Sequence, residues 1–422
     1  MSSRRVWRWF YLTLFFPLAL GAQQASLPDT SRLPFTPAGL GRAAWTWTGG
    51  SPNTDWITRA IVAKDGSIVA VGFVNRIDGG STTPEWDAVA MRFAPDGRLL
   101  WNRRYGGAGL DAFWDVKETT DGLAFTGFSV SGGAGGNDAW LVLADSSGAT
   151  FSERRYGGPG DDRGTALVAA ANGDLTIVGE TEGDSTRGRE VFIVRVDSMG
   201  TERWRRAYGG TGVDRAFYAS PVSGGIVLAG VTGAVGAYDI LTMKVDDNGA
   251  VVWRQVVGAE GNDPNHGLNV LPDGRIMVAG YSQSWGATVH DVVALTYSPD
   301  GELLRHEMIG MPGDDRVMGT ATDSAGGTWF TGYTRSGGSG GWDIMMARGR
   351  PDGSFESWLS AIGTPFDDNA YAIATAPNGD LIIGGYTSAS GGAGSPPDLL
   401  VMRIDPRQIE RKTEGVVVRR IK

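Results

Sequence analysis

One glycine-rich phrase ending in an aspartate recurs along the chain, and its spacing limits the fold more than any other feature. Three clear copies are "YGGAGLDAF" at 105–113, "YGGPGDDRG" at 156–164 and "YGGTGVDRA" at 208–216. The closing aspartates, called the anchor aspartates below, follow one another at 56, 51, 52, 49, 52 and 53 residues: Asp55, Asp111, Asp162, Asp214, Asp263, Asp315 and Asp368. Self-similarity with a period of about fifty residues predicts a repeat architecture.

Each repeat reads as four short strands. In "DNAYAIATAPNGDLIIGGYTSASGGAGSPPDLLVMRID" at 368–405, the first strand runs from the anchor to the turn "PNGD", and the second is the apolar run "DLIIGGY". A strand that is apolar on both faces must be covered on both faces. The third strand opens with a carboxylate in every repeat: Asp87, Asp138, Glu190, Asp239, Asp291, Asp343 and Asp398. A turn then leads into a fourth strand, as in "LLWNRRYGG".

Four antiparallel strands repeated seven times predict an all-β fold, a seven-bladed β-propeller with four-stranded antiparallel blades. The seventh blade has only three strands by Asp405, and "RAAWTWTGG" at 42–50 is a fourth-strand sequence that precedes the first anchor. We therefore expect this N-terminal strand to complete the last blade and close the ring, so that the propeller spans 42–405. The alternative closing strand is "GVVVRRIK" at 415–422.

The two ends of the chain differ in character from the repeats. Residues 1–22 combine a basic start, an apolar stretch and small residues, which is typical of a secretory signal peptide cut after Gly21 or Ala22. An uncleaved anchor is the alternative, although the apolar stretch is shorter than the ~20 residues that a span needs. Residues 23–41 are expected to be a flexible lead-in, and 406–422 a basic tail with six basic and two acidic residues.

Composition restricts the class of partner. The formal net charge is −9, and it becomes −12 once the three arginines of the signal are removed. An acidic body repels phosphates, which argues against nucleic acid as a partner. The chain has no cysteine, so an exported form must be stable through burial without disulfides. We expect a monomer, secreted or periplasmic, with no membrane span after signal cleavage.

The repeat also resembles a known group of proteins. The run "YGGPGDD…NGDLTIVGETEG…VFIVRVDSMG…W" is similar to the bacterial secreted β-propeller repeats of the SBBP type. The resemblance covers about residues 42–405. It implies the propeller fold and export, and it implies little about chemistry.

The two carboxylate series are expected to line one face of the ring. In one interpretation each anchor aspartate caps its own turn by accepting backbone N–H bonds. In the other, the anchor aspartates form an acidic ring that holds Ca²⁺, the only cofactor that the sequence suggests. Because a residue needed seven times is usually needed by the blade itself, the first interpretation is favoured.

Function is expected where the repeats differ. Three arginines directly follow their anchors: Arg163, Arg215 and Arg316. Three aromatic residues stand just before the third strand: Trp86, Tyr238 and Trp342. The arginines could pair with carboxylates at the channel mouth, and the aromatic residues, with Trp140 and Trp285 nearby, could form a stacking platform for a sugar or protein. Charge balance and packing between blades are the alternatives.

Two of the three histidines are expected on the same face of one repeat. His266 follows Asp263 in an irregular anchor loop and His290 precedes Asp291, so that a His/Asp site is conceivable on this blade. The sequence has no P-loop, no G-x-S-x-G elbow and no H-E-x-x-H motif. The favoured function is therefore a rigid exported scaffold that binds a protein or a glycan on the carboxylate-lined face. The alternative is a polysaccharide lyase or hydrolase with its site around His266.

Overall fold

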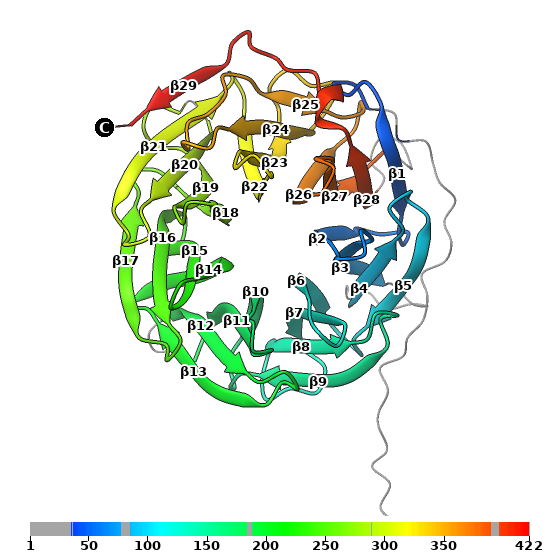
Figure 1. The fold of residues 1–422 in the computed structure, drawn as a ribbon, viewed down its shortest axis with the longest axis vertical. Helices are drawn as coiled ribbons and strands as arrows, with labels where there is room; N and C mark the ends of the chain where they lie inside the picture. Colours follow the sequence, from blue (N-terminus) through cyan, green and yellow to red (C-terminus); the bar gives the residue numbers. More distant parts are fainter. Residues whose placement is uncertain are drawn as a thin grey trace, which may run out of the picture.

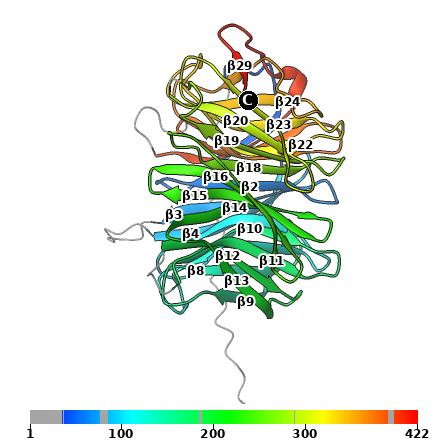
Figure 2. The ribbon, with the colours of Figure 1, turned by 90° about the vertical axis from the view of Figure 1, so that its left-hand side faces the viewer.

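The chain folds as a ring of seven β-sheet blades. The computed structural model describes residues 35, 37–76, 85–183, 188–287, 289–389 and 396–421. Figure 1 shows the blades side by side around a common centre, each with its first strand innermost. Figure 2 turns the ring edge-on, and the strands run across its thickness so that their turns lie on two opposite faces. The predicted seven-bladed β-propeller is confirmed.

The strands of each blade follow one another outward from the centre. Blade 1 comprises β2 (Trp56–Val62), β3 (Ile68–Arg76), β4 (Glu85–Phe93) and β5 (Leu99–Tyr105). Blade 2 comprises β6 (Asp111–Glu118), β7 (Leu123–Ser129), β8 (Asp138–Ala144) and β9 (Thr150–Tyr156). Blade 3 comprises β10 (Asp162–Ala169), β11 (Leu175–Thr181), β12 (Gly188–Val196) and β13 (Glu202–Tyr208). Blade 4 comprises β14 (Gly212–Val222), β15 (Gly225–Ala234), β16 (Ala237–Asp246) and β17 (Val251–Val257). Blade 5 comprises β18 (Asn265–Val270), β19 (Ile276–Ser282), β20 (Asp291–Tyr297) and β21 (Leu303–Gly310). Blade 6 comprises β22 (Asp315–Thr322), β23 (Thr328–Thr334), β24 (Asp343–Gly349) and β25 (Ser360–Ile362), and blade 7 begins with β26 (Asp368–Thr375), β27 (Leu381–Thr387) and β28 (Asp398–Ile404).

Blade 7 is completed from the other end of the chain. Strand β1 (Ala43–Gly49) pairs antiparallel with β28, and Trp47 lies opposite Val401. Trp47 is buried between blades 7 and 1, where its ring meets Phe93 edge-on at 5.4 Å. The Trp45 indole N–H donates to the carbonyl of Pro95 in blade 1 (3.0 Å). The N-terminal strand therefore closes the ring, as predicted.

The C-terminal tail does not complete blade 7, which was the alternative prediction for residues 415–422. Strand β29 (Val417–Arg420) pairs with β21, so that it adds a fifth strand to the outside of blade 5 and closes nothing. Before it, the 3₁₀ helix η1 (Pro406–Gln408) leads the chain across blade 6, where Lys412 bridges to Leu359. The basic tail thus docks on the propeller, and Arg419 forms an ion pair with Asp291 (2.8 Å).

The N-terminal lead-in is ordered where the structure describes it. Phe35 is buried, and Ala38 and Leu40 form bridges to Gly363 and Ile409. A flexible lead-in extending as far as residue 41 therefore does not hold, because its last residues pack on blade 6 and the tail. The predicted signal peptide at 1–22 lies outside the described residues. Within the described part of the chain, no helix has the length and apolarity to cross a membrane.

We expect the tail to stabilise the ring. Truncation after Gly415 removes β29 together with Val416 and Ile421, which pack against the cores beside blade 5. The loss of four paired residues and this apolar contact should lower the free energy of unfolding by about 2–4 kcal/mol. It should also promote self-association through the bared β21 edge. Calorimetry and sedimentation velocity measure both effects, and exposed Arg420→Gln, which keeps the strand, is the control. Equal melting of truncated and intact chains would contradict a stabilising tail.

The recurring phrase forms the joint between blades. Its tyrosine lies at the end of an outer strand and donates its hydroxyl proton to a carbonyl of the next blade: Tyr105 to Gly148 (2.7 Å), Tyr156 to Gly200 (2.5 Å) and Tyr208 to Gly249 (2.6 Å). The first glycine of the phrase lies five residues before the anchor in all seven copies: Gly50, Gly106, Gly157, Gly209, Gly258, Gly310 and Gly363. A Cβ atom at these glycines would lie 1.7–2.9 Å from a carboxylate oxygen of an anchor or of the preceding third strand. No larger residue fits there.

The residue directly after this first glycine confirms that each anchor aspartate caps its own turn. Its backbone N–H donates to the anchor carboxylate in every blade, at 2.6–3.1 Å where the contact has ordinary length: Ser51, Gly107, Gly158, Gly210, Ala259, Met311 and Thr364. A side chain is tolerated at this position, which explains why the second glycine of the phrase is replaced in four copies. The anchors therefore cap their own turns.

Candidate ligand-binding site in the central channel

A β-bulge in the innermost strand of every blade creates the site. The register of each first strand shifts three residues after the anchor, as between Ile57 and Arg59 in blade 1. The bulge places a carbonyl oxygen 1.8–2.1 Å from where a Cβ would stand on the facing second strand, which therefore carries a glycine in all blades: Gly72, Gly127, Gly179, Gly230, Gly280, Gly332 and Gly385. Bulges redirect a side chain away from the regular alternation.

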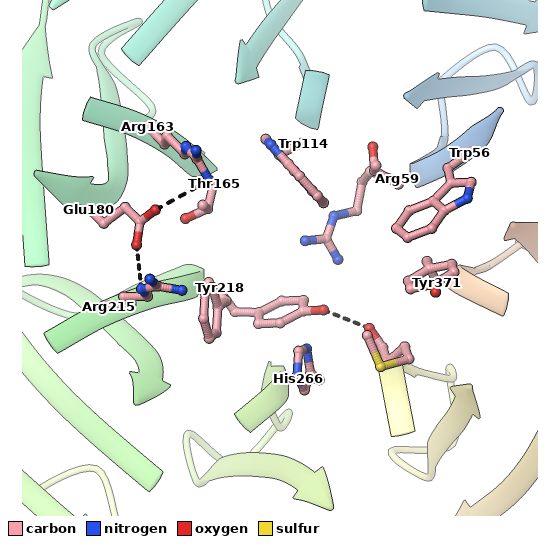
Figure 3. A pocket seen from close by; sticks show the side chains of 13 residues that line it. Trp56, Arg59, Trp114, Arg163, Thr165, Glu180, Arg215, Tyr218, His266 and Tyr371 are labelled. Carbon is pink, nitrogen blue, oxygen red and sulfur yellow. Dashed lines mark hydrogen bonds and ion pairs between the residues drawn. The ribbon is translucent and has the colours of Figure 1, made fainter. Parts of the chain in front are cut away.

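The seven bulged residues lie around one cavity. Six residue types occupy the seven positions: Thr58, Trp114, Thr165, Phe217, His266, Met318 and Tyr371. The cavity has a volume of about 290 Å³, and Figure 3 shows side chains from all parts of the ring converging on it. A position that is repeated in structure and varied in sequence is where one ring can become specific for one ligand.

Neighbouring positions of the same strands complete the lining. Trp56, Arg163 and Arg215 directly follow their anchors. Arg59 and Tyr218 come directly after the bulge, and Glu180 comes from β11. The Tyr218 hydroxyl donates to the carbonyl of Met318 (2.6 Å), so this side chain connects blade 4 to blade 6 across the channel (Figure 3).

Arg59 lies over the face of Tyr218. Its guanidinium carbon is 4.6 Å from the ring centroid, in the range of a cation–π contact. Its Nε lies 3.4 Å from Asp115 Oδ1, and the terminal nitrogens point toward the middle of the cavity in Figure 3. The same carboxylate also binds Lys117 Nζ (2.8 Å) and the backbone N–H of Leu167 (2.9 Å). Two cations thus share one carboxylate here.

The arginines of blades 3 and 4 are balanced by acidic partners. Glu180 pairs with Arg215 (2.6 Å), Arg189 (2.8 Å) and Arg163 (3.7 Å). Arg189 also pairs with Glu182 (2.6 Å) and Asp161 (3.6 Å). Three arginines therefore face three carboxylates in this cluster. The surplus positive charge at the cavity lies with Arg59.

Aromatic rings also line the channel. Trp56 stacks on Tyr371 with a centroid distance of 5.2 Å and on Tyr386 at 5.7 Å. His266 is held between Phe217 (5.6 Å, 2° between planes) and Tyr281 (5.4 Å, 3°). The cavity therefore has aromatic walls from blades 4, 5, 7 and 1, and a charged side from blades 1, 3 and 4.

The histidines of blade 5 do not pair with the aspartates that stand next to them in the sequence. Asp263 accepts hydrogen bonds from the hydroxyls of Ser282 (2.5 Å) and Ser284 (2.8 Å), which commits it to its own turn. His290 Nδ1 instead lies 3.0 Å from Asp314 Oδ1. Burial, followed by the Arg316 charge, lowers the pKa of His266 to about 4, so its imidazole is neutral at pH 7.

Of the residues predicted as binding residues, some line the cavity and the others lie outside it. Arg163, Arg215 and His266 line the cavity. Arg316 lies beside it, paired with Asp314 (2.7 Å) and flanked by the rings of Tyr281 and Trp342. Trp86 stacks on Phe73 (4.4 Å), which in turn contacts Trp56, while Tyr238 lies outside the lining. Trp140 is fully buried in the core of blade 2 and provides no binding surface, because it packs on Phe113.

The anchor aspartates are engaged within their own turns. Burial raises the pKa of Asp55 to about 7 and that of Asp368 to about 6, against the effect of the hydrogen bonds that each accepts. Within the described ranges, no three His, Asp or Glu side chains come together as metal ligands would. The N–H bonds within each turn account for these carboxylates.

Most of the lining was not recognised from the sequence. Trp56, Arg59, Trp114, Tyr218 and Tyr371 lie in runs that read as ordinary inner strands. A signal was nevertheless present, since a glycine in the middle of every apolar second strand marks a bulge or a close backbone approach. Aligning the repeats on that glycine would have singled out the bulged position.

Comparison with known proteins gives the fold and no more. No family model matches the sequence, and no curated protein matches it. The Pan2 WD40 domain of Neurospora crassa is similar in structure, with a TM-score of 0.52, 9% identity, and coverage of 90% of this chain and 99% of that chain. Sqt1 from Chaetomium thermophilum gives 0.45 with 13% identity over 84% and 87% of the two chains. A gluconolactonase from Xanthomonas campestris gives 0.41 with 14% identity over 92% and 99%. The chain is a β-propeller distantly similar in fold to WD40 domains.

Proposed function

We propose that this propeller is an exported binding scaffold, which recognises a protein or a glycan at the mouth of its central channel. The observation that carries this proposal is the contrast between two sets of seven positions. The anchor position is aspartate in every blade, and its carboxylate accepts a hydrogen bond from its own turn. The bulged position is different in nearly every blade and faces one cavity. The resemblance to secreted propeller repeats supports export.

Two features support recognition on the face that carries the anchors. In several blades the anchor N–H group donates to the backbone carbonyl of the residue that precedes the third-strand carboxylate of the preceding blade, as from Asp368 to Trp342 O (2.7 Å) and from Asp263 to Tyr238 O (2.7 Å). The cavity lining begins one residue after the anchors, so it lies nearest to this face. Aromatic and arginine side chains together are typical of binding hot spots.

A polysaccharide lyase or hydrolase remains the second candidate. Its support is that His266, Arg163 and Arg215 share one cavity. Against it, Asp263 is committed to Ser282 and Ser284, and Glu180 is committed to arginines. The acid and base that hydrolysis requires are therefore not poised together. Time-dependent breakdown of a captured glycan would favour this candidate over the scaffold.

The variant Trp114→Ala tests the binding proposal. Trp114 is a bulged residue whose ring projects into the cavity in Figure 3, so its truncation should affect the ligand more than the core. We expect binding of the intact chain on glycan and peptide arrays to weaken at least about tenfold, in line with the loss of an aromatic hot spot.

The matched control lies on the same blade. Phe151 is 45% exposed on β9, the outer strand of blade 2, and Phe151→Ala should leave array binding unchanged. Both variants should remain folded, because Phe151 is exposed and Trp114 is only partly buried against the small cluster of Phe73, Ala112 and Phe128; thermal melting checks this. Full binding by Trp114→Ala would show that recognition does not use the channel.

A further inference from the structure

We infer that the channel cavity accepts a small aromatic carboxylate, either free or displayed at the end of a larger partner. The inference rests on the proposed function insofar as the cavity is taken as the recognition site. Three properties lead to it: the size of the cavity, the location of its surplus charge, and the way in which its hydroxyl groups are used.

Size sets the first limit. A volume of about 290 Å³ is roughly twice that of a protein cavity of ~150 Å³ that holds one benzene molecule. This is room for a single ring system of roughly a dozen non-hydrogen atoms. A folded loop or an oligosaccharide is too large to be enclosed, and only one terminal group of such a partner fits inside.

Charge sets the second limit. The arginines of blades 3 and 4 are matched by Glu180, Asp161 and Glu182, while Arg59 shares Asp115 with Lys117. Arg59 Nε, like the Nε atoms of Arg163 and Arg215, is buried and makes no hydrogen bond within the described residues, and Arg59 differs from those two arginines because its cluster holds two cations and one carboxylate. Its terminal nitrogens point into the cavity (Figure 3). A planar guanidinium presented in this way suits a carboxylate, which it can bind through two parallel hydrogen bonds.

The hydroxyl groups set the third limit, because their protons are already directed to the backbone. Thr58 Oγ1 donates to Phe113 O (2.7 Å), Thr165 Oγ1 to Ala216 O (2.6 Å) and Tyr218 to Met318 O (2.6 Å). The one lining carboxylate, Glu180, is occupied by arginines. A sugar ring, which needs donors and acceptors on all sides, would find few free partners in this lining for the hydroxyls that enter the cavity, and a buried hydroxyl without a partner is costly.

An aromatic ring has no hydroxyl groups that would need hydrogen-bond partners in the cavity. Trp114, Phe217, Met318 and Tyr371 supply apolar wall, and Trp56 stacks on Tyr371 at its edge. A flat ring can insert between these groups while its carboxylate reaches Arg59. The cavity therefore discriminates against acidic sugars, which carry the same charge on a polar ring.

Isothermal titration of the folded full-length mature chain tests the inference with three probes. 2-Naphthoate provides the ring and the charge, 2-naphthamide keeps the ring without the charge, and glucuronate keeps the charge on a sugar ring. We expect saturable binding of 2-naphthoate, with each of the other probes at least about tenfold weaker. Arg59→Gln should weaken 2-naphthoate by a similar factor and leave 2-naphthamide unchanged. Exposed Arg98→Gln should change neither.

The outcomes separate this inference from the proposed function. Asp115 keeps Lys117 and the Leu167 N–H as partners, so Arg59→Gln should fold, and circular dichroism with thermal melting checks this. Absence of saturable 2-naphthoate binding, equal binding of 2-naphthamide, or full binding by folded Arg59→Gln would each overturn the inference. If Arg59→Gln unfolds, the probe comparison on the parent chain decides alone. Array binding that is lost in Trp114→Ala while 2-naphthoate does not bind would retain the scaffold and reject only the ligand class.

Discussion

Replacing Gly157 by alanine should lower the free energy of unfolding by about 2–6 kcal/mol. The new Cβ would stand 2.4 Å from Asp162 Oδ2 and 2.7 Å from Asp138 Oδ1, so two carboxylates of the joint must move. Overpacking of this kind costs about 1–3 kcal/mol. Displacing Asp162 also leaves the Gly158 N–H without its acceptor, at a further cost of about 1–3 kcal/mol.

The neighbouring glycine is the control. Nothing lies within 4 Å of a Cβ built on Gly158, and its backbone is not in the left-handed region. Gly158→Ala should therefore be neutral, or stabilise by up to about 0.5 kcal/mol by restricting the unfolded chain. Denaturant unfolding of the two variants measures the difference. Equal stability of Gly157→Ala and Gly158→Ala would mean that the joint does not depend on close packing of this glycine against the two carboxylates.

Trp47→Ala should have an effect of similar size, because this residue holds the ring closed. Trp47 is 7% exposed and packs against Phe93 of blade 1 while its strand pairs with blade 7. Deleting a buried tryptophan costs about 3–5 kcal/mol. The chain joins β1 to blade 1, whereas only strand pairing and packing hold β1 in blade 7, so hydrogen exchange should rise first in β1, β26, β27 and β28.

An equivalent strand in another blade provides the comparison. Val252 lies on β17, the outermost strand of blade 4, and is 54% exposed. Val252→Ala should change the unfolding free energy by no more than about 0.5 kcal/mol. If Trp47→Ala lowered stability without raising exchange at β26–β28, its role would be that of any core residue and not that of ring closure.

Much of the fold could be predicted because its determinants are local and repeated. The anchor aspartates marked every blade entry, and the unpaired sequence at 42–50 indicated the closing strand. The tail was harder to place. Its segment "GVVVRR" fits any open strand edge, and only the positions of Leu359 and β21 decide that it crosses blade 6 and pairs with blade 5.

The site could be predicted only in part. Arg163, Arg215 and His266 stood out because they are rare or sit next to an anchor, and they do line the cavity. Arg59 and Tyr218 were missed because a regular strand would place the residue after Thr58 or Phe217 on the other face. A bulge of one residue changes that face, and no single repeat reveals it. The pairing of His290 with Asp314 depends on contact between blades, which the linear order does not encode.

The closing strand also determines when the molecule can be finished during its synthesis. Gly49 and Leu399 are partners in blade 7 although they are 350 residues apart in sequence. At typical translation rates, roughly 20 to 70 seconds pass between the appearance of the first and the second. For all that time the segment "AAWTWTG" is an apolar strand without a partner, and such a strand is prone to aggregation. We therefore expect β1 to be the strand of the ring that stays unpaired longest, until β28 has been synthesised.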